Sequence, residues 1–301
     1  MSTSRHIIRG STQVVGLIGW PVEHSVSPPM HNAAFAELGL DWCYVPLPVH
    51  PDRVPEALLG AVALGLRGFN ATVPHKEALV PLVDTLTDAA RAIGAVNTVL
   101  LKDGKAVGHN TDAGGFLRAL NDAGFDPQGC SALVLGAGGA ARAVVYALAT
   151  SHARVTILNR TPTKAIALAA EFSPVSPRAR LQGGPLDESP IQQASLGVNL
   201  VVNTTPLGMW TRSSRIADAE HDEISPWPET VPFPREALLM DLIYNPRETP
   251  LMRQALQAGA RACDGLSMLV HQGAEAFTLW TGQDAPVDVM MAACVAILGG
   301  E

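Results

Sequence analysis

The chain has 301 residues, of which 47% are hydrophobic and 16% charged, and its formal net charge is −7. This length suits two average domains, and the composition is that of a globular protein with an ample core. No cluster of Lys or Arg occurs along the chain. A protein that binds nucleic acid or an anionic membrane needs a positive face to displace counterions, so we expect neither as a partner.

The four cysteines are widely scattered, and none belongs to a Cys-x-x-Cys pair; they are Cys43, Cys130, Cys263 and Cys294. Zinc ligands usually come as closely spaced pairs, so we expect no metal site. Four buried thiols in a reducing cytosol are the simpler interpretation. The apolar run Val14–Trp20 is interrupted by glycines and is too short for a signal peptide or a membrane span, so we expect a cytoplasmic protein.

In the first third of the chain, apolar runs typical of strands alternate with helical stretches. The expected strands are Val14–Ile18, Tyr44–Val49, Gly68–Val73 and Thr98–Leu101. The expected helices, Met30–Leu38 and Val54–Leu64, are each followed by a glycine, a common way for a helix to end. Lys102–Lys105 predicts a hairpin turn. The alternation indicates βαβ units and a mostly parallel sheet.

A second α/β run begins after Pro127. The expected strands are Ser131–Leu135, Val155–Leu158, Leu200–Val202 and Leu238–Leu242. The expected helices are Gly139–Ala149, one opened by Thr161 as N-cap with Pro162 next, Leu266–Trp280 and Val287–Leu298. Trp210–Pro234 is rich in Ser, Pro and acidic residues, and its length predicts a functional lid or a disordered insertion.

A glycine-rich string stands between an expected strand and an expected helix, and fits G-x-G-x-x-G/A. Glycines there let the backbone turn tightly and approach a pyrophosphate at the positive end of the helix. Glycine also marks ordinary tight turns, but here the strand, the spacing and the helix agree. The predicted dinucleotide-binding loop is Gly136, Ala137, Gly138, Gly139 and Ala140.

The end of the next strand indicates which dinucleotide binds. An NAD site usually carries Asp or Glu there to accept the ribose 2′-hydroxyl. This chain has Asn159, Arg160 and Thr161, followed by Lys164, and no carboxylate. A guanidinium and an ammonium suit a doubly charged 2′-phosphate, whereas the alternative is a solvated helix start. Two cations in a first helical turn oppose the helix dipole and gain from a nearby anion, so the pattern favours NADP.

Polar clusters stand where strands of the first third end. They are Glu23–Pro28, Asn70–Lys76, Ala95–Thr98 and Gly108–Asp112. In an extended segment Ser25 and Ser27 point the same way, so both hydroxyls can meet one ligand. Helix capping is the alternative, and it would explain Ser27 but not Ser25. Each cluster alone is more often a cap or a turn. Because ligands bind beyond the carboxyl ends of strands in open α/β sheets, we expect the clusters to converge into a polyol site.

In order along the chain, these segments resemble the motifs of shikimate dehydrogenases: GWPVEHSVSP (19–28), NATVPHK (70–76), GAVNT (94–98), NTD (110–112), GAGGAAR (136–142) and NRT (159–161). NTTPLGM (203–209), DLIYNP (241–246) and DGLSMLVHQ (264–272) continue the resemblance over nearly the whole chain. It implies a two-domain α/β fold. Residues 1–112, completed by helices within 265–301, would form a substrate-binding α/β domain, and residues 113–264 a Rossmann-like NADP-binding domain.

The resemblance also implies site residues. The substrate would be held by Ser25, Ser27, Thr72, Lys76, Asn97, Asp112, Tyr244 and Gln272. The cofactor would be held by the Gly136 loop with Asn159, Arg160, Thr161, Lys164, Leu242 and Gly265, and Asp88 aligns with an acidic position near the cofactor. His75 is a departure, since relatives often carry an aromatic or other residue there, and we expect no catalytic consequence from it.

The implied reaction is the reversible NADPH-dependent reduction of 3-dehydroshikimate to shikimate, on the route to chorismate and the aromatic amino acids, by a monomer or homodimer. Lys76, with Asp112, is the proton donor that the clusters offer. A helix beginning near Pro74 would place Lys76 in its first turn, where the dipole disfavours the ammonium. The alternative for Lys76 is an exposed surface lysine.

Three rival functions remain. A quinate/shikimate dehydrogenase would perform the same chemistry in a looser pocket. An NADP-binding sensor would have no need of Lys76 and Asp112, so their presence argues against it. A two-domain dehydrogenase acting on folates fits the paired serines less well than an enzyme acting on a polyol does.

Overall fold

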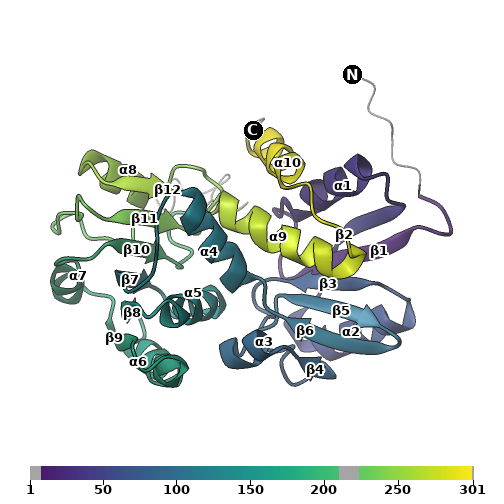
Figure 1. Cartoon of the computed structure of the whole chain (residues 1–301), viewed down its shortest axis with the longest axis horizontal. Helices are drawn as coiled ribbons and strands as arrows, with labels where there is room; N and C mark the ends of the chain where they lie inside the picture. The colour runs from purple at the N-terminus through teal and green to yellow at the C-terminus, as the bar shows by residue number, and fades with distance from the viewer. Residues whose placement is uncertain (1–7, 210–223, 300–301) are drawn as a thin grey trace. The chain divides into compact units, whose positions relative to one another are not determined.

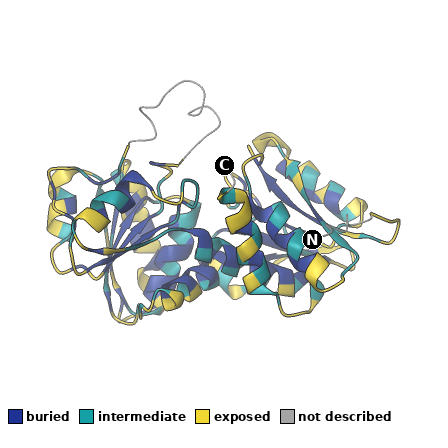
Figure 2. Ribbon diagram, turned by 90° about the horizontal axis from the view of Figure 1, so that it is seen from above, coloured by how far each residue is buried: buried dark blue, intermediate teal, exposed yellow. Residues whose placement is uncertain are grey.

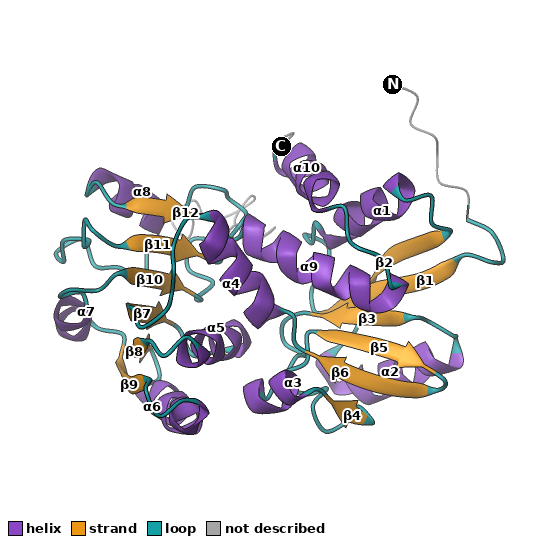
Figure 3. Ribbon diagram, in the orientation of Figure 1, coloured by secondary structure: helices purple, strands orange, loops and turns teal. Residues whose placement is uncertain are grey.

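The computed structural model describes residues 8–209 and 224–299. The chain divides into two compact units. The first consists of the described residues up to Thr111 together with those from Val270 onward, and the second of the described residues of Asp112–Leu269. Each unit is built on one six-stranded sheet with helices on its faces (Figures 1 and 3), as the α/β alternation of the sequence predicts.

The sheet of the first unit has the strand order β2-β1-β3-β5-β6-β4. Its strands are β1 (Gln13–Gly19), β2 (Trp42–Pro48), β3 (Gly68–Ala71), β4 (Thr85–Leu86), β5 (Thr98–Lys102) and β6 (Lys105–His109). Its helices are α1 (Ser27–Glu37), the 3-10 helix η1 (Pro51–Arg53), α2 (Val54–Ala63), α3 (Asp88–Ile93), most of α9 (Leu266–Thr281) and α10 (Val287–Leu298).

This first sheet is mixed. Strand β1 pairs in parallel with β2 and β3, whereas β5 runs antiparallel to both β3 and β6. The expected hairpin joins β5 to β6, with Asp103 and Gly104 both at positive φ, 52° and 74°. Two successive residues of that kind form the turn that matches the twist of antiparallel strands.

The two faces of the first sheet are covered differently. Helices α2 and α3 bury a mostly aliphatic cluster that includes Leu58 and Ala90. On the other face, aromatic rings of α1 and α9 pack together, among them His31 and Phe277, whose ring centroids are 6.5 Å apart. The Trp280 indole N–H donates to the backbone oxygen of Val99 (3.1 Å), which ties α9 to β5.

The sheet of the second unit has the order β12-β11-β10-β7-β8-β9, and neighbouring strands in it run parallel. Its strands are β7 (Ser131–Leu135), β8 (Arg154–Asn159), β9 (Arg180–Pro185), β10 (Leu200–Asn203), β11 (Leu238–Asp241) and β12 (Arg261–Cys263). Its helices are α4 (Asp112–Asp122), α5 (Gly139–Thr150), α6 (Pro162–Phe172), the 3-10 helix η2 (Ser173–Val175), α7 (Glu188–Ala194) and α8 (Pro250–Gln257).

The central strands of this second sheet are buried on both faces, as the dark blue ribbon in Figure 2 shows and as strands β10 and β11 illustrate, with no exposed residue in either. Helices α5 and α6 lie on one face and α7 and α8 on the other (Figure 3). Fully buried parallel strands of this kind give continuous apolar runs in the sequence, which is why the sequence predicts them well.

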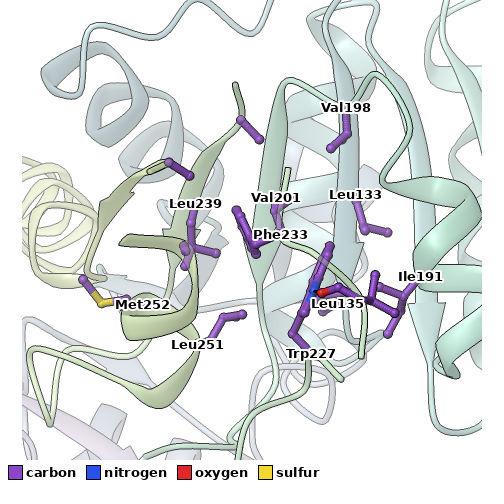
Figure 4. Close-up of a cluster of buried hydrophobic side chains, with 14 of the residues drawn as sticks. Leu133, Leu135, Ile191, Val198, Val201, Trp227, Phe233, Leu239, Leu251 and Met252 are labelled. Atoms are coloured by element: carbon purple, nitrogen blue, oxygen red, sulfur yellow. Dashed lines mark hydrogen bonds between the residues drawn. The ribbon is translucent and has the colours of Figure 1, made fainter. Parts of the chain in front are cut away.

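The irregular segment 224–234 packs into the core of the second unit. Trp227 and Phe233 are 2% and 6% exposed and lie against Leu135, Leu239 and other side chains of the sheet (Figure 4). The Trp227 indole N–H donates to the Val231 oxygen (2.8 Å), so its polar atom is satisfied. The prediction of a lid or a disordered insertion is therefore wrong for residues 224–234, and the rest of that segment, 210–223, lies outside the described residues.

The cysteines also differ from expectation. Cys130 and Cys294 are buried, but Cys43 and Cys263 are only partly so, and all four are free thiols. Burial raises the pKa of the Cys130 and Cys294 thiols to about 11. The helices of the described residues are all too short or too polar to cross a membrane.

Candidate active site

The polar clusters of the first unit meet at one edge of its sheet. The carboxyl ends of β1, β2 and β3 share this edge, because Gly19 pairs with Pro48 and Ile18 with Ala71. Strand β5 runs the opposite way and begins there, with Thr98 beside both Asn70 and His109. The expected convergence is thus confirmed for the segments that follow β1, β3 and β6 and precede β5. We call these segments the polar edge: residues 20–27, 72–76, 95–97 and 110–111.

Loops of the polar edge are tied to one another through their backbones. The Trp20 N–H donates to the Val73 oxygen (3.2 Å), and the Val49 N–H donates to the Gly19 oxygen (3.1 Å). A Cβ on Gly19 would lie 2.4 Å from Cγ2 of Thr72, so only glycine allows this approach. The position of Thr72 therefore depends on the turn after β1.

Ser25 and Ser27 do not lie in an extended segment as predicted. Residues 23–26 form a turn and a bend, and α1 begins at Ser27. The Ser27 N–H donates to the Ser25 hydroxyl (3.2 Å), so the local bond at this helix start involves the side chain of Ser25. The helix has no side-chain cap from its N-cap residue, Val26. The sequence offered helix capping as the alternative role of Ser27, but in the structure it is the Ser25 hydroxyl that accepts a backbone N–H at the start of this helix.

Lys76 does not lie in a helix, so the prediction that a helix dipole disfavours its ammonium is wrong. Residues 73–82 form a run of turns and one bend rather than an α-helix. The Lys76 carbonyl accepts a hydrogen bond from the Val96 N–H (2.8 Å), and the preceding residue, His75, has Nε2 2.8 Å from the Val49 oxygen. Lys76 itself is half-buried, so the alternative of a fully exposed surface lysine does not hold either. Its backbone is fixed by long-range hydrogen bonds.

Asn97 is the centre of a buried hydrogen-bond network. Its Nδ2 donates to the Thr111 hydroxyl (2.9 Å) and to Oε1 of Gln272 (3.3 Å). Its Oδ1 accepts from the Thr98 hydroxyl (3.1 Å) and the Thr111 N–H (2.8 Å). Asn70, which is 6% exposed, donates from Nδ2 to the Thr98 hydroxyl (2.9 Å). The structure thus brings Asn97 and Gln272 together, and it adds Asn70 and Thr98 to the residues that shape the site.

Other predicted site residues lie elsewhere. Asp112 is the first residue of α4 and is 4% exposed, and it belongs to the second unit, as does the half-buried Tyr244 after β11. Asp88 starts α3 of the first unit, where its fully exposed carboxylate pairs with Arg91 (3.3 Å). The other predicted cofactor residues belong to the second unit. For Asp88, its place in the first turn of α3 and its ion pair with Arg91 three residues later are enough to explain an acidic residue at this position.

The dinucleotide loop lies at the switch point of the second sheet. The chain runs from β7 outward to β8 and β9, then returns to place β10 on the other side of β7. Ligands bind at such a point in open α/β sheets. Gly136 has φ +109°, and a Cβ there would lie 2.4 Å from the Thr204 hydroxyl oxygen. A Cβ on Gly138 would meet nothing within 4 Å, so the backbone at the start of α5 faces open space.

The group that follows β8 fits a cofactor phosphate. Arg160, Thr161 and Lys164 are exposed, and α6 has no acidic residue in its first turn. Thr161 occupies the N-cap position as predicted, but its hydroxyl makes no capping bond. Within residues 8–209 and 224–299, neither Arg160 nor Lys164 forms a salt bridge. Two uncompensated cations and a hydroxyl at the end of the second strand suit the 2′-phosphate of NADP.

Leu242 and Gly265, both predicted cofactor residues, lie against each other. A Cβ on Gly265 would be 2.1 Å from the Leu242 oxygen, and the Gly265 N–H donates to the Ile243 oxygen (2.9 Å). Next to them, Asp241 is fully buried and accepts hydrogen bonds from Asn203 Nδ2 (2.9 Å), the Ile243 N–H (3.2 Å) and the Thr249 hydroxyl (2.7 Å).

Burial raises the pKa of Asp241 to about 6, and its three donors oppose that rise. The Asp241 carboxylate holds Asn203, whose Oδ1 in turn accepts from the N–H (3.0 Å) and the hydroxyl (2.7 Å) of Thr205. Asp241 therefore anchors the loop that faces Gly136. The sequence did not single out this aspartate, although a carboxylate at the carboxyl end of a buried strand is a usable signal. In the described part of the chain, no three His, Cys, Asp or Glu side chains are grouped as metal ligands would be.

Comparisons with known proteins agree across the chain. Residues 17–99 match the family described as "Shikimate dehydrogenase substrate binding domain", residues 119–182 "Shikimate / quinate 5-dehydrogenase", and residues 265–294 "Shikimate 5'-dehydrogenase C-terminal domain". A relative from Desulforamulus reducens, "Shikimate dehydrogenase (NADP(+))", is 47% identical over 285 residues, which is 94% of each chain.

Solved structures give the same result. A shikimate dehydrogenase in complex with NADP+ has a TM-score of 0.87 at 39% identity and covers 97% of this chain and 98% of its own. A shikimate 5-dehydrogenase from Thermus thermophilus, in complex with NADP(H) and shikimate, has a TM-score of 0.83 at 38% identity and covers 95% of this chain and 99% of its own.

Proposed function

This chain belongs to the shikimate dehydrogenase family, and on that premise we propose that it catalyses the reversible NADPH-dependent reduction of 3-dehydroshikimate to shikimate. The observation that carries the proposal is the polar edge of the first unit. There, hydroxyls, amides and one lysine come from four separated segments to one end of a sheet. A ring with several hydroxyl groups and a carboxylate needs this mixture of hydrogen-bonding groups and a cation.

On this proposal, the substrate is held by Ser25, Ser27, Thr72, Asn97, Tyr244 and Gln272, with Lys76 and Asp112. The internal hydrogen bonds of Asn97 occupy both its amide hydrogens and its oxygen. A bond from Asn97 to the substrate would therefore be shared with these partners. Asn97 also orients Gln272, which is the more accessible of the two.

The cofactor is NADP, held at its pyrophosphate by the Gly136 loop and at its 2′-phosphate by Arg160, Thr161 and Lys164. Leu242 and Gly265 line the same edge of the second sheet, and Asn159 fixes the turn by donating from Nδ2 to the Thr161 oxygen (3.0 Å). When bound, NADPH supplies the hydride that reduces the ketone carbon. Asp88, the proposed cofactor residue of the first unit, already pairs with Arg91 (3.3 Å), so it would have to share its carboxylate with that arginine to contact the cofactor.

The protein must deliver a proton to the carbonyl oxygen as the hydride arrives. We assign this to Nζ of Lys76, with Asp112 as its acid–base partner. Two features support the assignment: the Lys76 backbone is fixed by the Val96 N–H, and Asp112 directly follows Thr111, whose N–H is held by Asn97. The backbone of Lys76 is thus held within the polar edge, and Asp112 follows the last segment of that edge in the chain. In the reverse direction Lys76 accepts the proton from the substrate hydroxyl.

The test is nicotinamide absorbance with shikimate or quinate as substrate and NADP or NAD as cofactor. We expect kcat/KM for shikimate to be well above that for quinate, because quinate carries an extra hydroxyl on the carbon bearing its carboxylate. Comparable values for the two acids would favour the alternative, a quinate/shikimate dehydrogenase of broader specificity. No turnover of either acid, with NADP binding intact, would favour the sensor.

We further propose that the protein is cytoplasmic and acts as a monomer or homodimer. The four free cysteines support a reducing compartment. Sedimentation equilibrium over a range of protein concentrations would determine the oligomeric state, and cell fractionation the location.

A further inference from the structure

Tyr44 lies in the middle of β2, before the strand reaches the polar edge, and both its ring and its backbone are held by neighbouring side chains. It is 1% exposed, and its ring stacks on His31 with centroids 4.4 Å apart and planes 5° from parallel. The Asn32 side chain holds the Tyr44 backbone at both polar atoms: Nδ2 donates to the Tyr44 oxygen and Oδ1 accepts from its N–H, both at 2.9 Å. A ring held this firmly places its hydroxyl at a defined point.

The Tyr44 hydroxyl begins a chain of hydrogen bonds that reaches the predicted substrate residues. It donates to Oδ1 of Asn70 (2.9 Å), and Nδ2 of Asn70 donates to the Thr98 hydroxyl (2.9 Å). The Thr98 hydroxyl donates to Oδ1 of Asn97, and Nδ2 of Asn97 donates to Oε1 of Gln272 (3.3 Å). We call these five residues the Tyr44 network.

The directions of these hydrogen bonds agree along the whole network. Tyr44 presents a donor, so the Asn70 oxygen faces it, which leaves the Asn70 amide hydrogens for Thr98. Thr98 then has its own hydrogen free for Asn97. Burial raises the pKa of Tyr44, so the hydroxyl keeps the proton that it donates.

We propose that Tyr44 is a positioning residue for substrate binding, which acts without touching the substrate. It holds Asn70 in its orientation and, through Thr98, reinforces the orientation of Asn97 that the Thr111 N–H also selects, and with it that of Gln272. Buried amides have two orientations that differ by exchange of oxygen and nitrogen. At Asn70 the donor from Tyr44 selects one of them, and the Asn97 backbone oxygen, which accepts from Asn70 Nδ2 (3.2 Å), favours the same one. The inference rests on the proposed function, because it names shikimate as the ligand whose affinity Tyr44 sets.

The test is Tyr44→Phe, which keeps the stacked ring and removes the hydroxyl. The Asn70 oxygen then loses its donor, and one buried hydrogen bond of this kind changes affinity by about 3- to 10-fold. We expect KM for shikimate to rise by that factor, kcat to change less than 2-fold, and KM for NADP to stay the same. Tyr146→Phe is the matched control: Tyr146 lies in α5 of the second unit, against Phe172, and its variant should match the unmodified enzyme.

Thr98→Val provides a second, independent break in the network, and it decides the question if Tyr44→Phe does not fold. It keeps the shape of a fully buried side chain and removes the link between Asn70 and Asn97. The same rise in KM for shikimate alone is expected. A KM for shikimate that stays within 2-fold in the folded variants, or a parallel change in kcat and in KM for NADP, would overturn the inference. Lack of shikimate turnover by the unmodified enzyme would instead overturn the proposed function.

Discussion

Replacing Arg160 by Gln should weaken the use of NADP and leave the use of NAD unchanged. Arg160 is exposed after β8, and within residues 8–209 and 224–299 it makes no salt bridge, so its loss should not affect folding. A hydrogen bond to a charged group contributes about 1.5–3 kcal/mol. Since about 1.4 kcal/mol corresponds to a factor of ten, kcat/KM for NADP should fall by roughly 10- to 150-fold.

The assay is initial-rate absorbance with saturating shikimate and varied NADP or NAD. Arg160→Asp should go further and invert the preference, because a carboxylate there accepts the ribose 2′-hydroxyl of NAD and repels a 2′-phosphate. Arg178→Gln is the matched control, since Arg178 is also exposed but precedes the amino end of β9, whereas Arg160 follows the carboxyl end of the neighbouring parallel strand β8. Equal use of both cofactors by the unmodified enzyme, or an equal loss with both in Arg160→Gln, would refute the reasoning.

Three further changes test other parts of the site. Lys76→Ala should lower kcat by roughly 10²–10⁴-fold, with a far smaller change in substrate KM; the same change at exposed Lys102 should alter neither, and a near-normal kcat in Lys76→Ala would contradict the assignment. Burial raises the folded-state pKa of Asp241, so the native state binds this proton more tightly than the unfolded state does, and the free energy of unfolding should fall as pH rises from about 4 to about 6. Urea denaturation of Asp241→Asn should lack this pH-dependent fall, which amounts to up to about 3 kcal/mol. The same pH profile in the variant and the unmodified protein would exclude this role of Asp241. Gly136→Ala should destabilise the fold by about 1–3 kcal/mol because of its positive φ and the 2.4 Å contact, whereas Gly138→Ala, with open space around it, should keep the melting temperature but raise KM for NADP; the reverse pattern would contradict the assigned roles.

Most strands and the cofactor loop could be predicted from the sequence because their causes are local. Buried parallel strands such as Ser131–Leu135 are continuous apolar runs, and Gly136, directly after that strand, has a positive φ and a close neighbour that only glycine allows. Strand β9 (Arg180–Pro185) was not predicted. It lies at the sheet edge, is partly exposed along its length and contains two glycines, so its apolar signal is weak.

The details of the candidate site depend on long-range contacts, and there the sequence was less informative. A proline at position 74 suggested a helix that begins near Pro74, with Lys76 in its first turn, but the hydrogen bonds that fix this loop come from Val96 and Val49, twenty or more residues away. Trp227 likewise lies in a segment predicted to be a lid or a disordered insertion, but side chains of the distant sheet strands pack around it. The Tyr44 network could not be inferred at all, because it joins β2, β3, β5 and α9.

The first unit is assembled from two distant parts of the chain, and this affects the order in which it can form during synthesis. Its six strands are complete once His109 has left the ribosome, yet the indole of Trp280, which occupies the space that a side chain at Gly68 would fill, comes much later. The ring of Phe277, which packs against His31, also comes late. Until then the aromatic face of the sheet is covered by α1 but not by α9, whereas the second unit can already close around its own core. The nascent protein therefore exposes an aggregation-prone apolar surface that α9 covers only after it has been synthesised.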